Sequence, residues 1–141
     1  MSTEIARFLS ERKLVRAKIG REMVLKEVDA AQTDLQDARD SLERGKFKWA
    51  TIQGYYSMFH SARALLFSRG FREKSHYVLL LAVRELFSNE LERSLIDKFE
   101  GGMGLRQEAD YGLKFSETGA MYTIDGAEEL LTKAKELLKI K

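Results

Sequence analysis

The sequence predicts an all-α fold, an up-and-down bundle of four to five main helices with an N-terminal helical extension. Its 141 residues include no proline, the residue that helix interiors tolerate least. Long stretches carry apolar residues at spacings of three and four, and glycines follow two of these stretches. With 44% hydrophobic and 33% charged residues, the chain is expected to form one domain, residues 1–20 being the extension and 21–141 the core.

The first half of the chain predicts a helical hairpin after the extension. Apolar residues from Val24 to Leu42 alternate at spacings of four and three, the narrow seam of an antiparallel bundle. Gly45 is expected to end this helix. A second long helix is expected from Phe47 to Arg69, before Gly70. The short connection at Gly45 then makes the two helices neighbours.

The next two segments predict shorter helices. Ser75 is a suitable N-cap for a helix that continues to Ser88 with a broad apolar face. Helical spacing resumes from Leu91 to Tyr111, but this stretch contains three glycines between 101 and 104. Because glycine costs about 1 kcal/mol in a helix interior, we expect a kink or a break there.

The C-terminal part predicts a loop and a last helix. No sustained period is visible from Lys114 to Thr123, so this segment is expected to be a loop, either mobile or closing over a site. Asp125, with Glu128 three residues later, has the pattern of a capping box. The final helix is therefore expected to start there and to bury its leucines up to Leu138.

The composition excludes several classes of function. The formal net charge of +2 provides no global field for nucleic acid, so any such contact must be local. The absence of cysteine excludes disulfides, thiol nucleophiles and the usual zinc sites, and it fits a reducing cytoplasm. No apolar run reaches the ~20 residues that span a bilayer. We expect a cytoplasmic protein with no membrane contact, metal or cofactor.

The segment from 55 to 66 carries two separate faces on a helical period. The apolar face predicts core and consists of Tyr55, Met58, Phe59, Ala62, Leu65 and Leu66. The second stripe, roughly a third of a turn away, consists of Trp49, Tyr56, His60, Arg63 and Phe67. A core helix needs only the first face. The second stripe therefore predicts a homodimer contact, a ligand surface or a chemical site.

Three motifs occur in a distinctive order: YYSMFHSARALL at 55–66, KSH at 74–76 and RQEADY at 106–111. Together they resemble the small prokaryotic HEPN-domain proteins (higher eukaryotes and prokaryotes nucleotide-binding), over residues 22–141. Ribonucleases of this family carry an arginine, four to six other residues and then a histidine. Here R-x-x-A-D-Y stands in that place, with no later histidine, as in an uncharacterised branch of the family.

The resemblance implies a helical module that dimerises. It also implies a small nucleotidyltransferase partner, a nucleotide or RNA ligand, or both, in a toxin-antitoxin or stress-response pair. The surface expected for the ligand or the dimer consists of Trp49, Tyr56, His60, Arg63, Phe67 and Tyr111. A structural dimer without a ligand is a further reading.

The competing reading is a metal-independent endoribonuclease. Such cleavage needs a group that takes the proton of a 2'-hydroxyl, one that protonates the leaving oxygen and a cation beside the phosphate. Arg106 can hold the phosphate through its planar fork. With the family histidine missing, His60 or Asp110 would have to move the proton. We favour the binding module over the enzyme.

Structural roles compete with each of these assignments. His60 and Tyr56 are suited to hydrogen-bonded packing at a helix or subunit interface, because buried polar groups need partners. Arg106 can pair with Asp110 and hold no ligand. His76 is expected to be a residue in the first turn of its helix, where the helix dipole disfavours its charged form.

Overall fold

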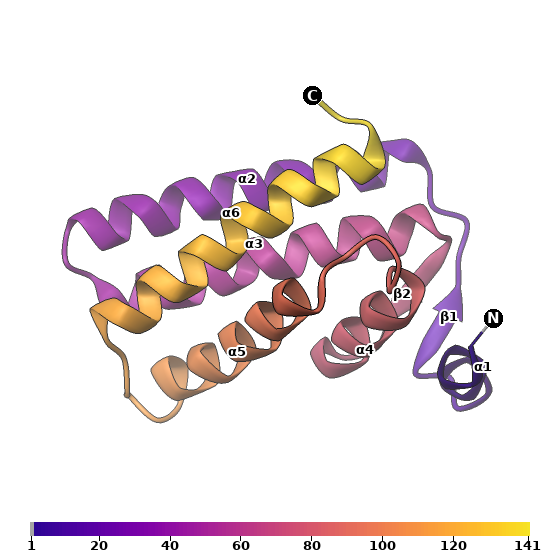
Figure 1. The fold of residues 1–141 in the computed structure, drawn as a ribbon, viewed down its shortest axis with the longest axis horizontal. Helices are drawn as coiled ribbons and strands as arrows, with labels where there is room; N and C mark the ends of the chain where they lie inside the picture. The colour runs from indigo at the N-terminus through magenta and orange to yellow at the C-terminus, as the bar shows by residue number, and fades with distance from the viewer. Residues whose placement is uncertain (1) are drawn as a thin grey trace.

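The structure is a computed structural model that describes residues 2–141, and its helices pack as a bundle (Figure 1). In chain order the elements are α1 (Thr3–Ser10), β1 (Leu14–Arg16), α2 (Arg21–Glu43), α3 (Phe47–Ser68), β2 (Phe71–Glu73), α4 (His76–Leu86), α5 (Arg93–Asp110) and α6 (Glu117–Leu138). The predicted all-α class is confirmed, with one small antiparallel ribbon added. None of the helices within 2–141 has the length and hydropathy that a membrane span requires.

Helix α3 lies at the centre, in contact with α2, α5 and α6. The predicted α2 seam is buried against the bundle from Val24 to Ala38. All six residues of the predicted apolar face of α3 are buried as well. On its α6 side, α3 carries Gly54, where an added Cβ would lie 3.0 Å from Cγ2 of Thr123. Helix α6 therefore covers one face of α3 closely and leaves the opposite face, which carries the second stripe, uncovered by α6.

The N-terminal extension is only partly helical, which corrects the expectation for residues 1–20; Met1 lies outside the described residues. Helix α1 ends at Ser10, and β1 pairs antiparallel with β2, with Leu14 opposite Glu73 and Arg16 opposite Phe71. Leu14 is fully buried. Because this strand is three residues long and its partner lies far downstream, no hydrophobic period in the neighbouring sequence indicates it.

Helix α5 runs unbroken through its glycines, so the expected break is wrong. The reason is tertiary packing. A Cβ on Gly101 would lie 2.7 Å from the hydroxyl oxygen of Tyr122, and one on Gly102 would collide with the terminal methyl of Met58. These two glycines let α5 approach α6 and α3, and the packing gained offsets their low helix propensity.

The expected loop from 114 to 123 is wrong over most of its length, because α6 begins at Glu117. Ser116 is the N-cap, and its Oγ accepts a hydrogen bond from the Gly119 amide at 3.0 Å. The first turns of α6 bury Ala120 and Thr123, small residues whose helical spacing carries little hydropathy. Asp125 and Glu128 therefore lie inside the helix and do not begin it.

Tight turns follow α2 and α3, and a capped turn begins α4. Gly45 between α2 and α3, and Gly70 after α3, adopt φ angles of 71° and 80°, which favour glycine. After β2, the Oγ of Ser75 accepts a hydrogen bond from the Val78 amide at 3.2 Å, which confirms the predicted N-cap. His76 is consequently held in the first turn of α4, beside α3.

Candidate functional site

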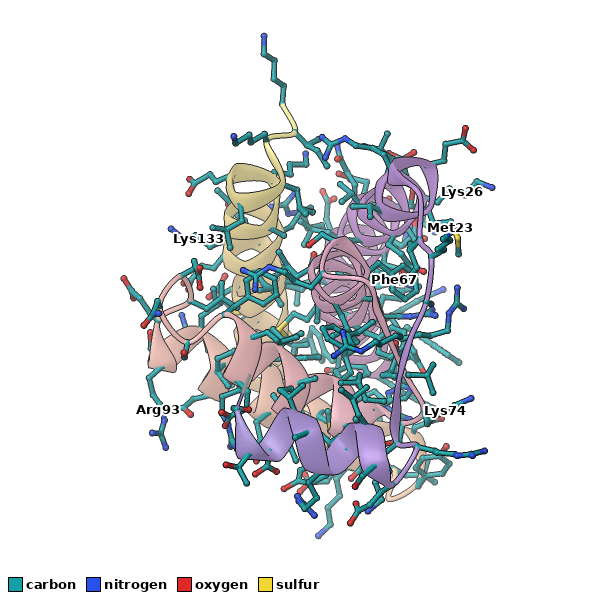
Figure 2. The ribbon with its side chains drawn as sticks, turned by 90° about the vertical axis from the view of Figure 1, so that its right-hand side faces the viewer. Met23, Lys26, Phe67, Lys74, Arg93 and Lys133 are labelled. Carbon is teal, nitrogen blue, oxygen red and sulfur yellow. The ribbon has the colours of Figure 1, made fainter. Side chains whose placement is uncertain are left out.

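The second stripe of α3 is exposed at one end and buried at the other. Trp49 is 50% exposed, Tyr56, His60 and Arg63 are half-buried, and Phe67 is only 2% exposed. Figure 2 shows Phe67 inside the bundle, on α3. The part of the stripe available to a partner or ligand thus runs from Trp49 to Arg63, between α2 and α5.

His60 and Arg63 are held by carboxylates from neighbouring elements. The His60 ring lies 2.5 Å from Glu27 through Nδ1 and 3.6 Å from Asp34 through Nε2. Arg63 lies 3.3 Å from Glu27 and 3.0 Å from Glu73. Both residues therefore tie α3 to α2, and Arg63 also ties it to β2. This is the structural role that competed with a catalytic one for His60.

Glu73 is the most buried member of this network, with a side chain only 8% exposed. Its Oε1 has no hydrogen-bond partner among the described residues, and the Nε of Arg63 faces Oε2 without the alignment of a hydrogen bond. Burial raises the pKa of the Glu73 carboxyl, while Arg63 opposes the shift. The network is thus incompletely satisfied on its β2 side.

Arg106, on α5, lies among tyrosine rings. Its guanidinium carbon is 5.1 Å from the ring centre of Tyr55, 5.6 Å from that of Tyr56 and 6.0 Å from that of Tyr111. The side chain is only 9% exposed. Its carboxylate partner, Asp110, is at 3.9 Å, beyond hydrogen-bond distance, and the Nε atom has no hydrogen-bond partner within residues 2–141. This cation is stabilised mainly by aromatic faces.

His76 completes this cluster, although its place in the sequence predicts only a residue in the first turn of a helix. Its Nδ1 lies 2.6 Å from the hydroxyl of Tyr55, a fully buried residue of α3. Burial, and then the positive charges of Arg106 and Arg63, lower the pKa of His76. Both effects favour the neutral form of the His76 ring. One signal was available, because a buried tyrosine hydroxyl needs a partner.

The structure therefore brings together some of the predicted site residues and separates others. Arg106 lies with Tyr56 and Tyr111. His60 belongs instead to the carboxylates of α2. The arrangement around Arg106 combines a cation with an incomplete set of partners, a neutral histidine and aromatic rings. Such a set can hold a phosphate and can take up a proton beside it.

A second feature, a hollow of about 510 Å³ between α5 and α6, has a different character. Arg106 does not line it, and its lining includes Glu92, Asp125, Glu129 and Lys98. Lys98 is itself paired with Glu129 at 2.7 Å. The remaining carboxylates disfavour a phosphate there. Among residues 2–141, no group of histidines and carboxylates is arranged to hold a metal ion.

Comparison with solved structures shows the same architecture in TT1696 from Thermus thermophilus. The TM-score is 0.71 at 17% sequence identity, and the match covers 80% of this chain and 96% of the other. At this identity the likeness concerns the fold alone.

Sequence comparisons add two archaeal relatives. A UPF0332 protein from Archaeoglobus fulgidus is 33% identical over 109 residues, which cover 74% of this chain and 86% of that protein. A protein named "Putative toxin MJ0605", from Methanocaldococcus jannaschii, is 30% identical over 125 residues, which cover 84% and 91% respectively. The sequence model of the HEPN domain matches residues 26–141, a span that includes α3, His76 and Arg106. The chain belongs to the HEPN domain family.

Proposed function

We propose that this chain is a phosphate-binding HEPN module of a toxin-antitoxin pair, which holds a nucleotide or RNA at Arg106. The observation that carries the proposal is the state of the Arg106 guanidinium. It is nine-tenths buried, its Nε lacks a hydrogen-bond partner among the described residues and its carboxylate partner is 3.9 Å away. Burying a cation without close partners costs free energy, and a bound phosphate would accept two parallel hydrogen bonds from the guanidinium.

The surroundings of Arg106 fit a nucleotide better than a free carboxylate or sulfate. Tyr56 is half-buried and Tyr111 is 76% exposed, so their rings border the guanidinium and remain available to a base or a sugar. Aromatic rings beside an arginine are a recurrent means of holding single nucleotides and unpaired bases. A relative that carries the name of a toxin supports a role in such a pair.

Arg106→Lys tests this function because it keeps the charge and removes the planar fork. We expect at least a tenfold loss of affinity for AMP, or for a short single-stranded RNA, in isothermal titration calorimetry. Arg93→Lys is the matched control, since Arg93 lies on the same helix with its side chain 87% exposed (Figure 2). Equal affinities of Arg106→Lys and Arg93→Lys would refute the phosphate site.

The module is also proposed to dimerise and to bind a small nucleotidyltransferase. The half-buried His60 and Arg63, on the α2 side of the α3 stripe, form the surface we assign to the second copy. Light scattering on the purified chain, whose subunit mass is 16.2 kDa, should then give twice that mass. Co-purification with a nucleotidyltransferase from the same genome tests the partner. A monomer at all concentrations would contradict the dimer.

A second candidate function, metal-independent endoribonuclease, is favoured by one observation. His76 lies in the same aromatic cluster as Arg106, so a histidine is present near the arginine although the motif histidine is missing. Its neutral ring is suited to take the proton of a 2'-hydroxyl while Arg106 holds the phosphate. In this reading His76 replaces His60 and Asp110.

Cleavage of mixed-sequence RNA in EDTA separates the two functions. The enzyme predicts cleavage that is lost in both Arg106→Ala and His76→Ala and retained in His60→Ala. Loss in His60→Ala alone would restore His60 as the proton acceptor. A folded protein that binds RNA and leaves it intact would support the binding module.

A further inference from the structure

Trp49, in the first turn of α3, is an exposed aromatic residue that the Arg106 cluster does not include. It is the only tryptophan of the chain, and half of its surface is exposed. The Nζ of Lys48 lies 4.9 Å from the centre of its ring. A large flat side chain held in solvent, with a cation over one face, is costly to expose and well suited to stack on another ring.

Trp49 lies on the same face of α3 as the Arg106 cluster. It precedes Tyr56 by two helical turns on the stripe, which corresponds to a rise of about 10 Å. Tyr56 in turn lies against Arg106. Tyr111, the C-cap of α5, also borders Arg106. Helices α3 and α5 run antiparallel, since Thr51 and Glu108 line the same small hollow. The two ends of the surface are therefore Trp49 and Arg106.

The cations at the two ends of this surface attract a polyanion to it. Lys48 stands at the Trp49 end and Arg106 at the other. On the α2 side, Asp37 and Asp40 line a hollow together with Arg44 and Lys46, so opposite charges balance there. Cations that alternate with aromatic faces are the pattern with which proteins hold single-stranded nucleic acid, whereas a protein partner needs no such alternation.

We propose that Trp49 is a base-stacking platform for a single-stranded oligonucleotide whose phosphate lies on Arg106. The ligand is then longer than a mononucleotide, because the rise of about 10 Å between Trp49 and Tyr56, the residue that contacts Arg106, corresponds to roughly three stacked nucleotide steps of ~3.4 Å each. This inference rests on the proposed phosphate site at Arg106 and extends it by a second subsite.

The test uses the fluorescence of the single tryptophan. The full chain is titrated with a six-nucleotide 2'-O-methyl RNA, which excludes cleavage, and separately with AMP. We expect the oligonucleotide to quench Trp49 and AMP to leave it unchanged. Labelled oligonucleotide anisotropy should show that Trp49→Ala weakens binding by about five- to 150-fold, and that Trp49→Phe retains most of the affinity.

Met121→Ala is the control, because Met121 is 48% exposed on α6, which packs on the opposite face of α3. If Trp49→Ala binds the oligonucleotide as tightly as Met121→Ala while Arg106→Lys loses it, the stacking platform is refuted and the phosphate site stands. If the tryptophan fluorescence changes with protein concentration but is unaffected by RNA, Trp49 belongs to a dimer contact and the proposal is overturned. If Arg106→Lys changes neither titration, the phosphate site fails and the platform fails with it.

Discussion

Tyr55→Phe tests the contact that joins His76 to the centre of the bundle. The substitution removes one hydroxyl and keeps the ring that packs against Phe59, Phe99 and Arg106. The lost atom is the partner of His76 Nδ1 at 2.6 Å, the side-chain bond that fixes α4 to α3. We therefore expect lower stability and a looser His76 without a cavity in the core.

The magnitude follows from the burial of the two partners. A hydrogen bond contributes a net ~0.5–1.5 kcal/mol, and an unpaired buried group raises the loss to as much as ~3 kcal/mol. Tyr55 is fully buried, but His76 is half-buried, so water can reach its ring once the hydroxyl is gone. We expect a loss of about 1–2 kcal/mol in the free energy of unfolding. At ~4 °C per kcal/mol, the melting temperature should fall by several degrees.

Urea unfolding followed by circular dichroism measures this loss, and Tyr56→Phe is the matched control. The Tyr56 hydroxyl makes no side-chain hydrogen bond within residues 2–141, so this variant should lose less than ~0.5 kcal/mol. A double-mutant cycle with His76→Ala should recover a coupling of about 0.5–1.5 kcal/mol. Equal stabilities of the two phenylalanine variants, or a coupling near zero, would refute the reasoning.

Three further predictions concern other parts of the molecule. Burial and two neighbouring arginines lower the pKa of His76 in the folded chain, so on acidification the unfolded chain binds the proton first. The free energy of unfolding should therefore rise with pH up to about 6.5. Urea unfolding from about pH 5 to 7 should show that His76→Gln flattens this rise. Gly102→Ala should lower the free energy of unfolding by about 1–3 kcal/mol, because the new methyl group would collide with a buried methionine. Gly104→Ala, which has open space at its Cβ, should raise the free energy of unfolding by up to ~1 kcal/mol. The same urea assay compares the two variants. Lys48→Ala should lower the slope of log affinity against log salt concentration for oligonucleotide binding by about one counterion. An unchanged slope would show that Lys48 contacts no phosphate of the oligonucleotide.

The parts of the fold that the sequence predicted well are those with large apolar residues at a helical period. The seam from Val24 to Ala38 and the core face of α3 are buried as expected. Helix α5 was misjudged because propensity penalises Gly101 and Gly102 locally, while their value lies in contacts with other helices. The start of α6 was missed because its buried face is made of small residues.

The candidate site was predictable only in part. The sequence singled out Arg106 and Tyr56 separately, and only the structure shows that they are in contact. Spacing along one helix predicted the stripe, but it could not reveal that Glu27 and Asp34 hold His60, since those carboxylates come from another helix. The pairing of His76 with Tyr55 joins two elements through a turn and a strand. Such contacts depend on tertiary geometry that periodicity does not encode.

The ribbon between β1 and β2 has a consequence for the order in which the protein is made. Leu14 leaves the ribosome long before Glu73, its partner in the ribbon, so the N-terminal segment must wait while α2 and α3 form their local contacts. Glu73 directly precedes the turn that carries Ser75 and His76. The strand that leads into the His76 turn is thus completed only when the N-terminal segment returns to the middle of the chain. We expect an N-terminal truncation to loosen this turn, which the Ser75 cap and Tyr55 still hold, before it unfolds the bundle.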